Sequence, residues 1–159
     1  MEINILFTLI LSWVLFSISK EDIKTMLISE TKLRIFAISG IIYIVTVGLL
    51  YKSINTIDLI TDNISAMLIV FLIMYFISRI SYNLFKVNSL GIGDIKLSSI
   101  SSIWLGIELT FISLSISFIL SAIYSIYGKI TKRFGSFHQY PFAPFLSIGI
   151  FCSWILDKI

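Results

Sequence analysis

Residues 109–128 read LTFISLSISFILSAIYSIYG, a stretch of 20 residues without a charged side chain. At ~1.5 Å of rise per residue, a helix of this length crosses the ~30 Å hydrocarbon core of a bilayer. Similar uncharged stretches occupy residues 3–19, 35–51, 63–78 and 134–156. Such spans must be helical, because lipid offers backbone N–H and C=O groups no partner. The pattern therefore predicts an all-α membrane protein.

The composition supports the same fold class. Of the 159 residues, 57% are hydrophobic and 13% are charged, whereas a soluble domain usually has about 25% charged residues. We expect one polytopic membrane domain over residues 1–159. Its six or so helices would lie near residues 3–20, 33–51, 62–83, 91–107, 108–128 and 141–157. The first stretch has neither a basic leader nor a small-residue cleavage site after it, so we expect a retained helix.

The basic residues indicate how these helices are oriented. With the N-terminus outside, ten Lys and Arg residues fall on one face and only Lys52 and Lys158 fall on the other. The richer face is expected to be cytoplasmic, with both chain ends outside. The net charge of +3 is thus a topology signal and does not predict nucleic-acid binding. The ten residues are Lys20, Lys24, Lys32, Arg34, Arg79, Lys86, Lys96, Lys129, Lys132 and Arg133.

The fourth predicted span contains charges. Only 11 uncharged residues separate Lys96 from Glu108, and as a helix they would cover about 16 Å. Asp94 is therefore drawn into or near the membrane, where an acid is costly and marks a functional site. It follows Gly91 and Gly93, which permit unusual backbone angles or the close approach of another chain. We expect Lys96 to extend to the headgroups.

A second acid lies at the same predicted depth. The first helix ends near Lys20, so Asp22 lies at the cytoplasmic interface where the fourth helix begins at Asp94. Two adjacent carboxyl groups do not both ionise easily, so one keeps a proton while the other acts as a base. This pair could activate a water molecule and protonate a peptide carbonyl without metal or cofactor. Asp58 and Asp62 fall on the opposite face.

Other interpretations remain open at this point. Asp94 alone could be an ordinary acid at a helix start, and Asp22 could belong to a solvated turn in which Glu21 is the alternative acid. Asp94 could also be the ion site of a small transporter or channel, and a non-catalytic assembly factor is a third class. The single cysteine, Cys152, excludes an intramolecular disulfide and is expected to be a packing residue.

Three segments together resemble the type IV prepilin peptidases, a bacterial family of GxGD aspartyl peptidases. Residues 91–97 (GIGDIKL) are similar to the family's GxGDxKL motif, and residues 22–28 (DIKTMLI) to its first aspartate motif. Ser29 stands where that first motif usually ends in proline. Residues 140–146 (YPFAPFL) resemble the family's PFxPFL segment, with Pro141, Phe142 and Pro144 as candidates for the substrate side.

The resemblance implies a chemistry and a location. Asp22 and Asp94 would be the catalytic carboxylates, supported by a turn made of Gly91, Gly93 and Lys96. The substrate would be a prepilin or pseudopilin, whose basic leader is removed at the cytoplasmic face of the bacterial inner membrane. The cysteine-containing methyltransferase domain of larger relatives has no counterpart here, so the resemblance implies a peptidase-only form.

Overall fold

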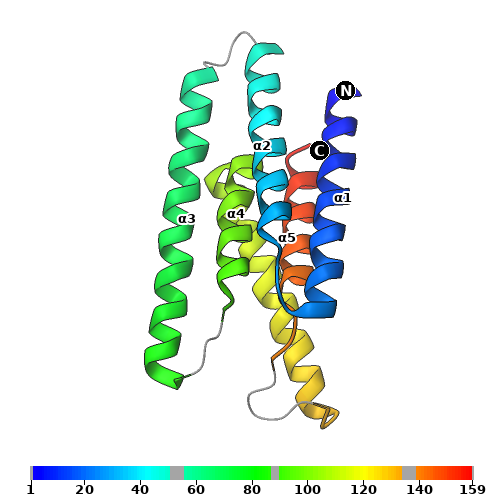
Figure 1. The fold of residues 1–159 in the computed structure, drawn as a ribbon, viewed down its shortest axis with the longest axis vertical. Coiled ribbons are helices and arrows are strands. Elements are labelled where there is room, and N and C mark those ends of the chain that lie inside the picture. Colours follow the sequence, from blue (N-terminus) through cyan, green and yellow to red (C-terminus); the bar gives the residue numbers. More distant parts are fainter. Residues whose placement is uncertain (1, 51–55, 87–89, 134–138, 159) are drawn as a thin grey trace.

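The computed structural model describes residues 2–50, 56–86, 90–133 and 139–158, and within these ranges all regular structure is helical. Five helices follow one another (Figure 1): α1 (Glu2–Thr25), α2 (Glu30–Leu50), α3 (Thr56–Phe85), α4 (Ile92–Ile130) and α5 (Ala143–Leu156). The prediction of an all-α protein is confirmed. Helix α1 begins, and α5 ends, at the same end of the molecule.

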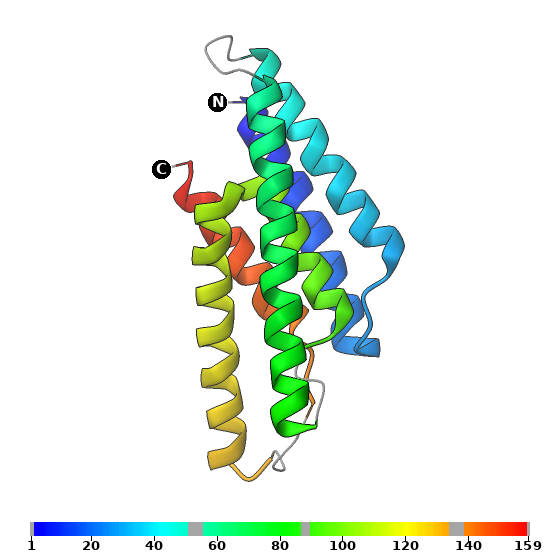
Figure 2. The same ribbon diagram turned by 90° about the vertical axis from the view of Figure 1, so that its left-hand side faces the viewer.

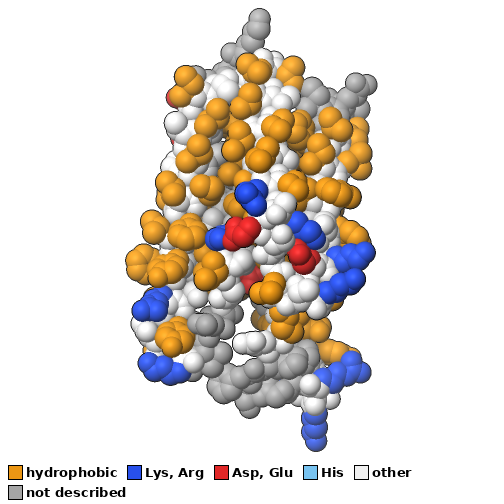
Figure 3. All heavy atoms as spheres, in the orientation of Figure 1, with side chains coloured by type: hydrophobic (Ala, Val, Ile, Leu, Met, Phe, Trp, Pro, Cys, Tyr) orange, Lys and Arg blue, Asp and Glu red, His pale blue; other side chains and the backbone are white. Residues whose placement is uncertain are grey.

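Four of these helices, α1 to α4, are long and apolar enough to cross a bilayer. Large apolar side chains cover their outer faces, for example Trp13, Phe16 and Phe76, which are 67%, 68% and 60% exposed. Figure 3 shows such side chains over most of the upper half of one face, with Lys and Arg in the lower half. Exposed apolar surface of this extent belongs in lipid, so the chain is a membrane protein. Six crossings and the orientation of the chain ends remain predictions.

Helix α4 is kinked at Gly106, where φ is 73° and ψ is 180°. Its two limbs run in opposite directions (Figure 2). The limbs correspond to the separately predicted helices 91–107 and 108–128, and the reversal occurs just before Glu108. Beside the kink, the side-chain amide of Asn63 on α3 donates a hydrogen bond to the carbonyl of Ile103 at 3.1 Å.

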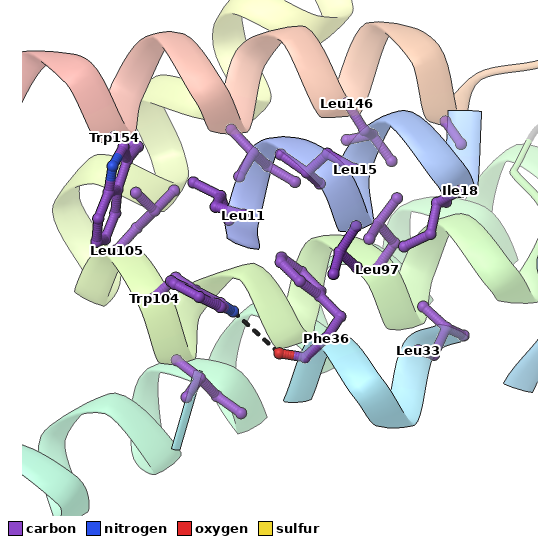
Figure 4. Packing of buried hydrophobic residues seen from close by; sticks show 14 of the residues in the cluster. Leu11, Leu15, Ile18, Leu33, Phe36, Leu97, Trp104, Leu105, Leu146 and Trp154 are labelled. Carbon is purple, nitrogen blue, oxygen red and sulfur yellow. Dashed lines mark hydrogen bonds between the residues drawn. The ribbon is translucent and has the colours of Figure 1, made fainter. Parts of the chain in front are cut away.

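An aromatic cluster joins α2, α4 and α5 in the core. Trp104 stacks on Phe36 and on Tyr43, with ring centroids 5.8 Å and 5.6 Å apart, and meets Trp154 edge-on. Its indole N–H donates to the carbonyl of Phe36 at 3.0 Å (Figure 4). A Cβ at Gly40 would lie 2.7 Å from the Trp104 Nε1, so the absence of a side chain there lets the indole approach the α2 backbone.

Helix α5 lies close to the second limb of α4. A Cβ on Gly149 would lie 2.2 Å from the Ser117 Oγ and 2.3 Å from the carbonyl oxygen of Ser113. Small residues permit this close approach of membrane helices. On another side of α5, the hydroxyls of Ser147 and Ser19 are 2.8 Å apart, which ties α5 to α1. These contacts place the amino end of α5 beside the last turns of α1.

Candidate active site

Asp22 lies near the end of α1 and is buried, with only 5% of its surface exposed. The helix ends soon after it, because Met26 adopts a positive φ of 52°. The Oδ2 of Asp22 accepts a hydrogen bond from the backbone N–H of Ala143 at 3.0 Å. Ala143 is the first residue of α5, so its N–H has no partner within that helix and is free to bind a carboxylate.

Asp94 lies in the first turn of α4, which begins after Gly91. One carboxyl oxygen, Oδ1, is buried and has no hydrogen-bond partner among the described residues. The backbone of Gly91 contacts the same carboxyl group. Buried polar atoms in native proteins are usually satisfied, so an unpaired carboxyl oxygen here indicates a group available to a ligand or a water molecule.

The structure brings Asp22 and Asp94 together. They are 72 positions apart in the sequence, but α1 ends and α4 begins at the same end of the bundle (Figure 1). Their carboxyl groups are near enough to interact as like charges. Two carboxyl groups in such a position do not both ionise easily, so the ionisation of one opposes that of the other. Asp58, in the first turn of α3, lies at the opposite end of the bundle.

Glu21, the alternative first acid, has other partners. Its Oε2 forms an ion pair with Lys32 at 3.3 Å and accepts the backbone N–H of Ser29 at 3.3 Å. Lys32 in turn donates to the carbonyl of Ser17 at 2.7 Å. Glu21 therefore stabilises the α1–α2 connection, and the structure places Asp22, not Glu21, beside Asp94.

The two glycines before Asp94 act through close approach and not through unusual backbone angles. Gly91 is extended, with φ −70° and ψ 148°, and Gly106 is the only described glycine with positive φ. Of the two possibilities that the sequence left open for these glycines, unusual backbone angles and close approach, only close approach is found. A Cβ at Gly93 would lie 3.1 Å from the Cβ of Ile28, and one at Gly91 would lie 3.1 Å from the Asp94 Oδ2.

Lys96 has a protein partner that the sequence did not predict. Its Nζ forms an ion pair with the carboxylate of Glu30 in the first turn of α2. The pair joins the first turn of α4 to α2, and it is partly exposed. Lys96 thus contributes to the position of this turn, in addition to its expected place near the headgroups.

The segment with Pro141, Phe142 and Pro144 lies at the start of α5. Phe142 is 9% exposed and packs among the core residues. Pro144 falls within the first turn, where a missing N–H costs nothing, and not in a second turn that it would bend. The residue that touches the site is Ala143, which sequence reasoning missed. The only signal for Ala143 in the sequence was its position between Phe142 and Pro144, at the start of a helix.

The family model described as "Type IV leader peptidase family" matches residues 9–126, a range that includes both Asp22 and Asp94. The chain belongs to this family. No curated protein and no solved structure matches it. The family match thus indicates a peptidase in a membrane, and it does not favour the transporter interpretation of Asp94.

This leader peptidase has its two paired carboxyl groups inside the matched range, whereas α5 lies beyond it. Helix α5 nevertheless contributes the Ala143 N–H to Asp22. Among the described residues, no three His, Cys, Asp or Glu side chains gather as a metal site would require. The groups that this arrangement brings together are two carboxyl groups and one backbone donor.

Proposed function

We propose that the protein is an aspartic endopeptidase that removes the short basic leader of prepilin-like proteins, with Asp22 and Asp94 as its catalytic residues. The observation that carries the proposal is the proximity of these two carboxyl groups. Asp22 is buried at the end of α1, and Asp94 has a buried unpaired oxygen at the start of α4. A carboxylate and a carboxylic acid together supply the base and the acid that peptide hydrolysis needs.

The position of the pair supports a substrate with a membrane-embedded part. Most of the basic residues lie at the same end of the bundle as Asp22 and Asp94. By the positive-inside rule, this end is the cytoplasmic one. An apolar substrate helix could remain in lipid while its leader bond reaches Asp22 and Asp94 at the interface. We therefore propose cleavage at the cytoplasmic face of a bacterial inner membrane, with a prepilin or pseudopilin as the partner.

The test is co-expression with a prepilin-like substrate, whose mature fraction is read from its length on a gel. The wild-type chain is expected to cleave, and Asp22→Asn and Asp94→Asn are each expected to abolish cleavage at an equal level of membrane-inserted enzyme. Asp62→Asn is the matched control, because it changes an exposed aspartate of α3 to the same residue. Cleavage by both dyad variants at the wild-type rate would refute the proposal.

A further inference from the structure

We infer that the amino end of α5 assigns different roles to the two aspartates: the Ala143 N–H holds Asp22 as the ionised base, and Asp94 carries the proton. This inference rests on the proposed aspartic mechanism and adds to it the identity of the base, the identity of the acid and a positioning group outside both motifs. It follows from the unequal hydrogen bonding of the two carboxyl groups.

The hydrogen bond to Asp22 is enclosed within the protein. Asp22 is 5% exposed and Ala143 is fully buried, and their N···O distance is 3.0 Å. The backbone of Phe142 also contacts the Asp22 carboxyl group. An N–H bond to an ionised oxygen is about twice as strong as one to a neutral oxygen, and the first turn of a helix carries partial positive charge. Both effects favour the carboxylate form of Asp22.

Asp94 has less support for a negative charge. Its Oδ1 is buried without a partner in the described part of the chain, and a buried ionised oxygen without a donor is costly. When the pair holds one proton, that proton is therefore best placed on Asp94. A proton on Oδ1 can then turn toward a substrate carbonyl, because no described protein group is hydrogen-bonded to that oxygen.

Contacts on α5 keep the donor in place. Gly149 lies against the backbone of α4 near Ser113, and the Ser147 hydroxyl meets that of Ser19 on α1. Ser19 lies one turn before Asp22 on the same helix. The amino end of α5 is thus fixed relative to the carboxylate that it serves, so that the donor is preorganised before substrate binds.

The roles give a balanced hydrolytic step. The Asp22 carboxylate takes a proton from water as the water oxygen bonds to the scissile carbonyl carbon, and Asp94 gives its proton to the carbonyl oxygen. In the resulting gem-diol one hydroxyl comes from the water and the other is the former carbonyl oxygen with the proton from Asp94, so Asp22 is now protonated and Asp94 is ionised. As the C–N bond breaks, the leaving nitrogen takes the proton from Asp22, and a gem-diol hydroxyl returns a proton to Asp94.

The first experiment reads protonation directly and needs no substrate. The full chain, with side-chain ¹³C label in aspartate, is studied by NMR in detergent or lipid. Asp22 and Asp94 are distinguished by pairwise labelling with their different preceding residues, Glu21 and Gly93. At the pH at which the pair holds a single proton, the signal of Asp22 should be that of a carboxylate and the signal of Asp94 that of a carboxylic acid. The opposite assignment, or a proton shared equally, would overturn the inference.

The second experiment removes only the donor. Replacing Ala143 by lactic acid, its α-hydroxy analogue, converts the amide N–H into an ester oxygen and keeps the side chain. We expect kcat to fall by about 10- to 100-fold with little change in KM, the range for loss of a hydrogen bond to a charged group. The carboxyl signal of Asp22 should shift in the same protein.

The matched control is the same ester at Phe145, whose N–H donates to the carbonyl of Phe142 at 3.0 Å within the same turn. It removes a hydrogen bond of the same turn of α5 but leaves the donor to Asp22 intact. Equal kcat in the two ester variants would overturn the role of Ala143 while the proposed function stands. If the wild-type chain fails to cleave, the proposed function fails, and the NMR experiment still decides which aspartate is protonated.

Discussion

Glu21 and Asp22 are neighbours in the sequence, but their carboxyl groups point to different parts of the protein. Glu21 binds Lys32 and the Ser29 N–H at the α1–α2 connection. Asp22 is buried and bound by Ala143 of α5. Adjacent helix positions are about 100° apart, so only one of the two acids can face the start of α4.

This difference predicts different effects of matched substitutions. Glu21→Gln should keep most of the cleavage activity, because the ion pair with Lys32 is partly exposed and such a pair typically contributes about 1 kcal/mol or less. Asp22→Asn should reduce cleavage by at least about 100-fold, the lower range for loss of a general acid or base. The measurement is the mature fraction of a co-expressed substrate. An inactive Glu21→Gln beside an active Asp22→Asn would show that the first acid is misassigned.

Gly93 predicts a graded loss of activity with side-chain size. A Cβ there would contact Ile28 at 3.1 Å, so Gly93→Ala requires a shift of a few tenths of an ångström, whereas Gly93→Val adds two methyl groups to the same space. We expect Gly93→Val to lose cleavage while still inserting into membranes, and Gly93→Ala to be milder. The double variant Gly93→Ala/Ile28→Ala removes the contacts with Cγ1 and Cδ1 at 3.3 Å but keeps the contact with the Cβ, so it should restore only part of the activity. Full activity of Gly93→Val would contradict the close packing of this turn.

Gly149 and Cys152 both lie in α5, so alanine at Gly149 can be compared with alanine at Cys152 as a matched control. A Cβ on Gly149 would fall 2.3 Å from a backbone oxygen of α4, which cannot move away as a flexible side chain can. Cys152 is exposed on α5. Gly149→Ala should therefore lower the thermal stability in detergent and reduce cleavage, because the displaced α5 carries the Ala143 donor. Cys152→Ala should change neither. Equal stability of the two variants would argue against the close α4–α5 contact.

The sequence identified the helices and the two acids, for physical reasons. Uncharged stretches of about 20 residues have few alternatives to a helix in lipid, and an acid such as Asp94 between two such stretches is conspicuous. The pairing of Asp22 with Asp94 followed from counting crossings. The role of Ala143 could not be predicted, because a backbone donor has no side-chain signature. The Lys96–Glu30 pair also depends on the angle between α2 and α4, which the sequence alone does not define.

The orientation of the bundle can be tested at described positions. In a Cys152→Ala background, Ile57→Cys at the start of α3 should react with an impermeant thiol reagent added outside. Thr25→Cys at the end of α1 should react only after the membrane is opened. Both residues are exposed, so access to the reagent depends on the side of the membrane. The reverse pattern would place Asp22 and Asp94 at the outer face and contradict cleavage on the cytoplasmic side.

The reversal in α4 predicts that Gly106 is hard to replace. Its φ of 73° and ψ of 180° lie in a region that is essentially restricted to glycine, where other residues cost about 1–3 kcal/mol. Gly106→Ala should therefore lower the free energy of unfolding by about that amount, whereas Ser115→Ala, an exposed change in the same helix, should have little effect.

Asn63→Ala removes the donor to the Ile103 carbonyl beside the kink, and a hydrogen bond between membrane helices contributes about 0.5–2 kcal/mol. Unfolding in a detergent series measures all three. Because the kink directs the second limb of α4 back toward α5, Gly106→Ala should also reduce cleavage. A Gly106→Ala variant with wild-type stability would show that the two limbs of α4 are not joined by this turn.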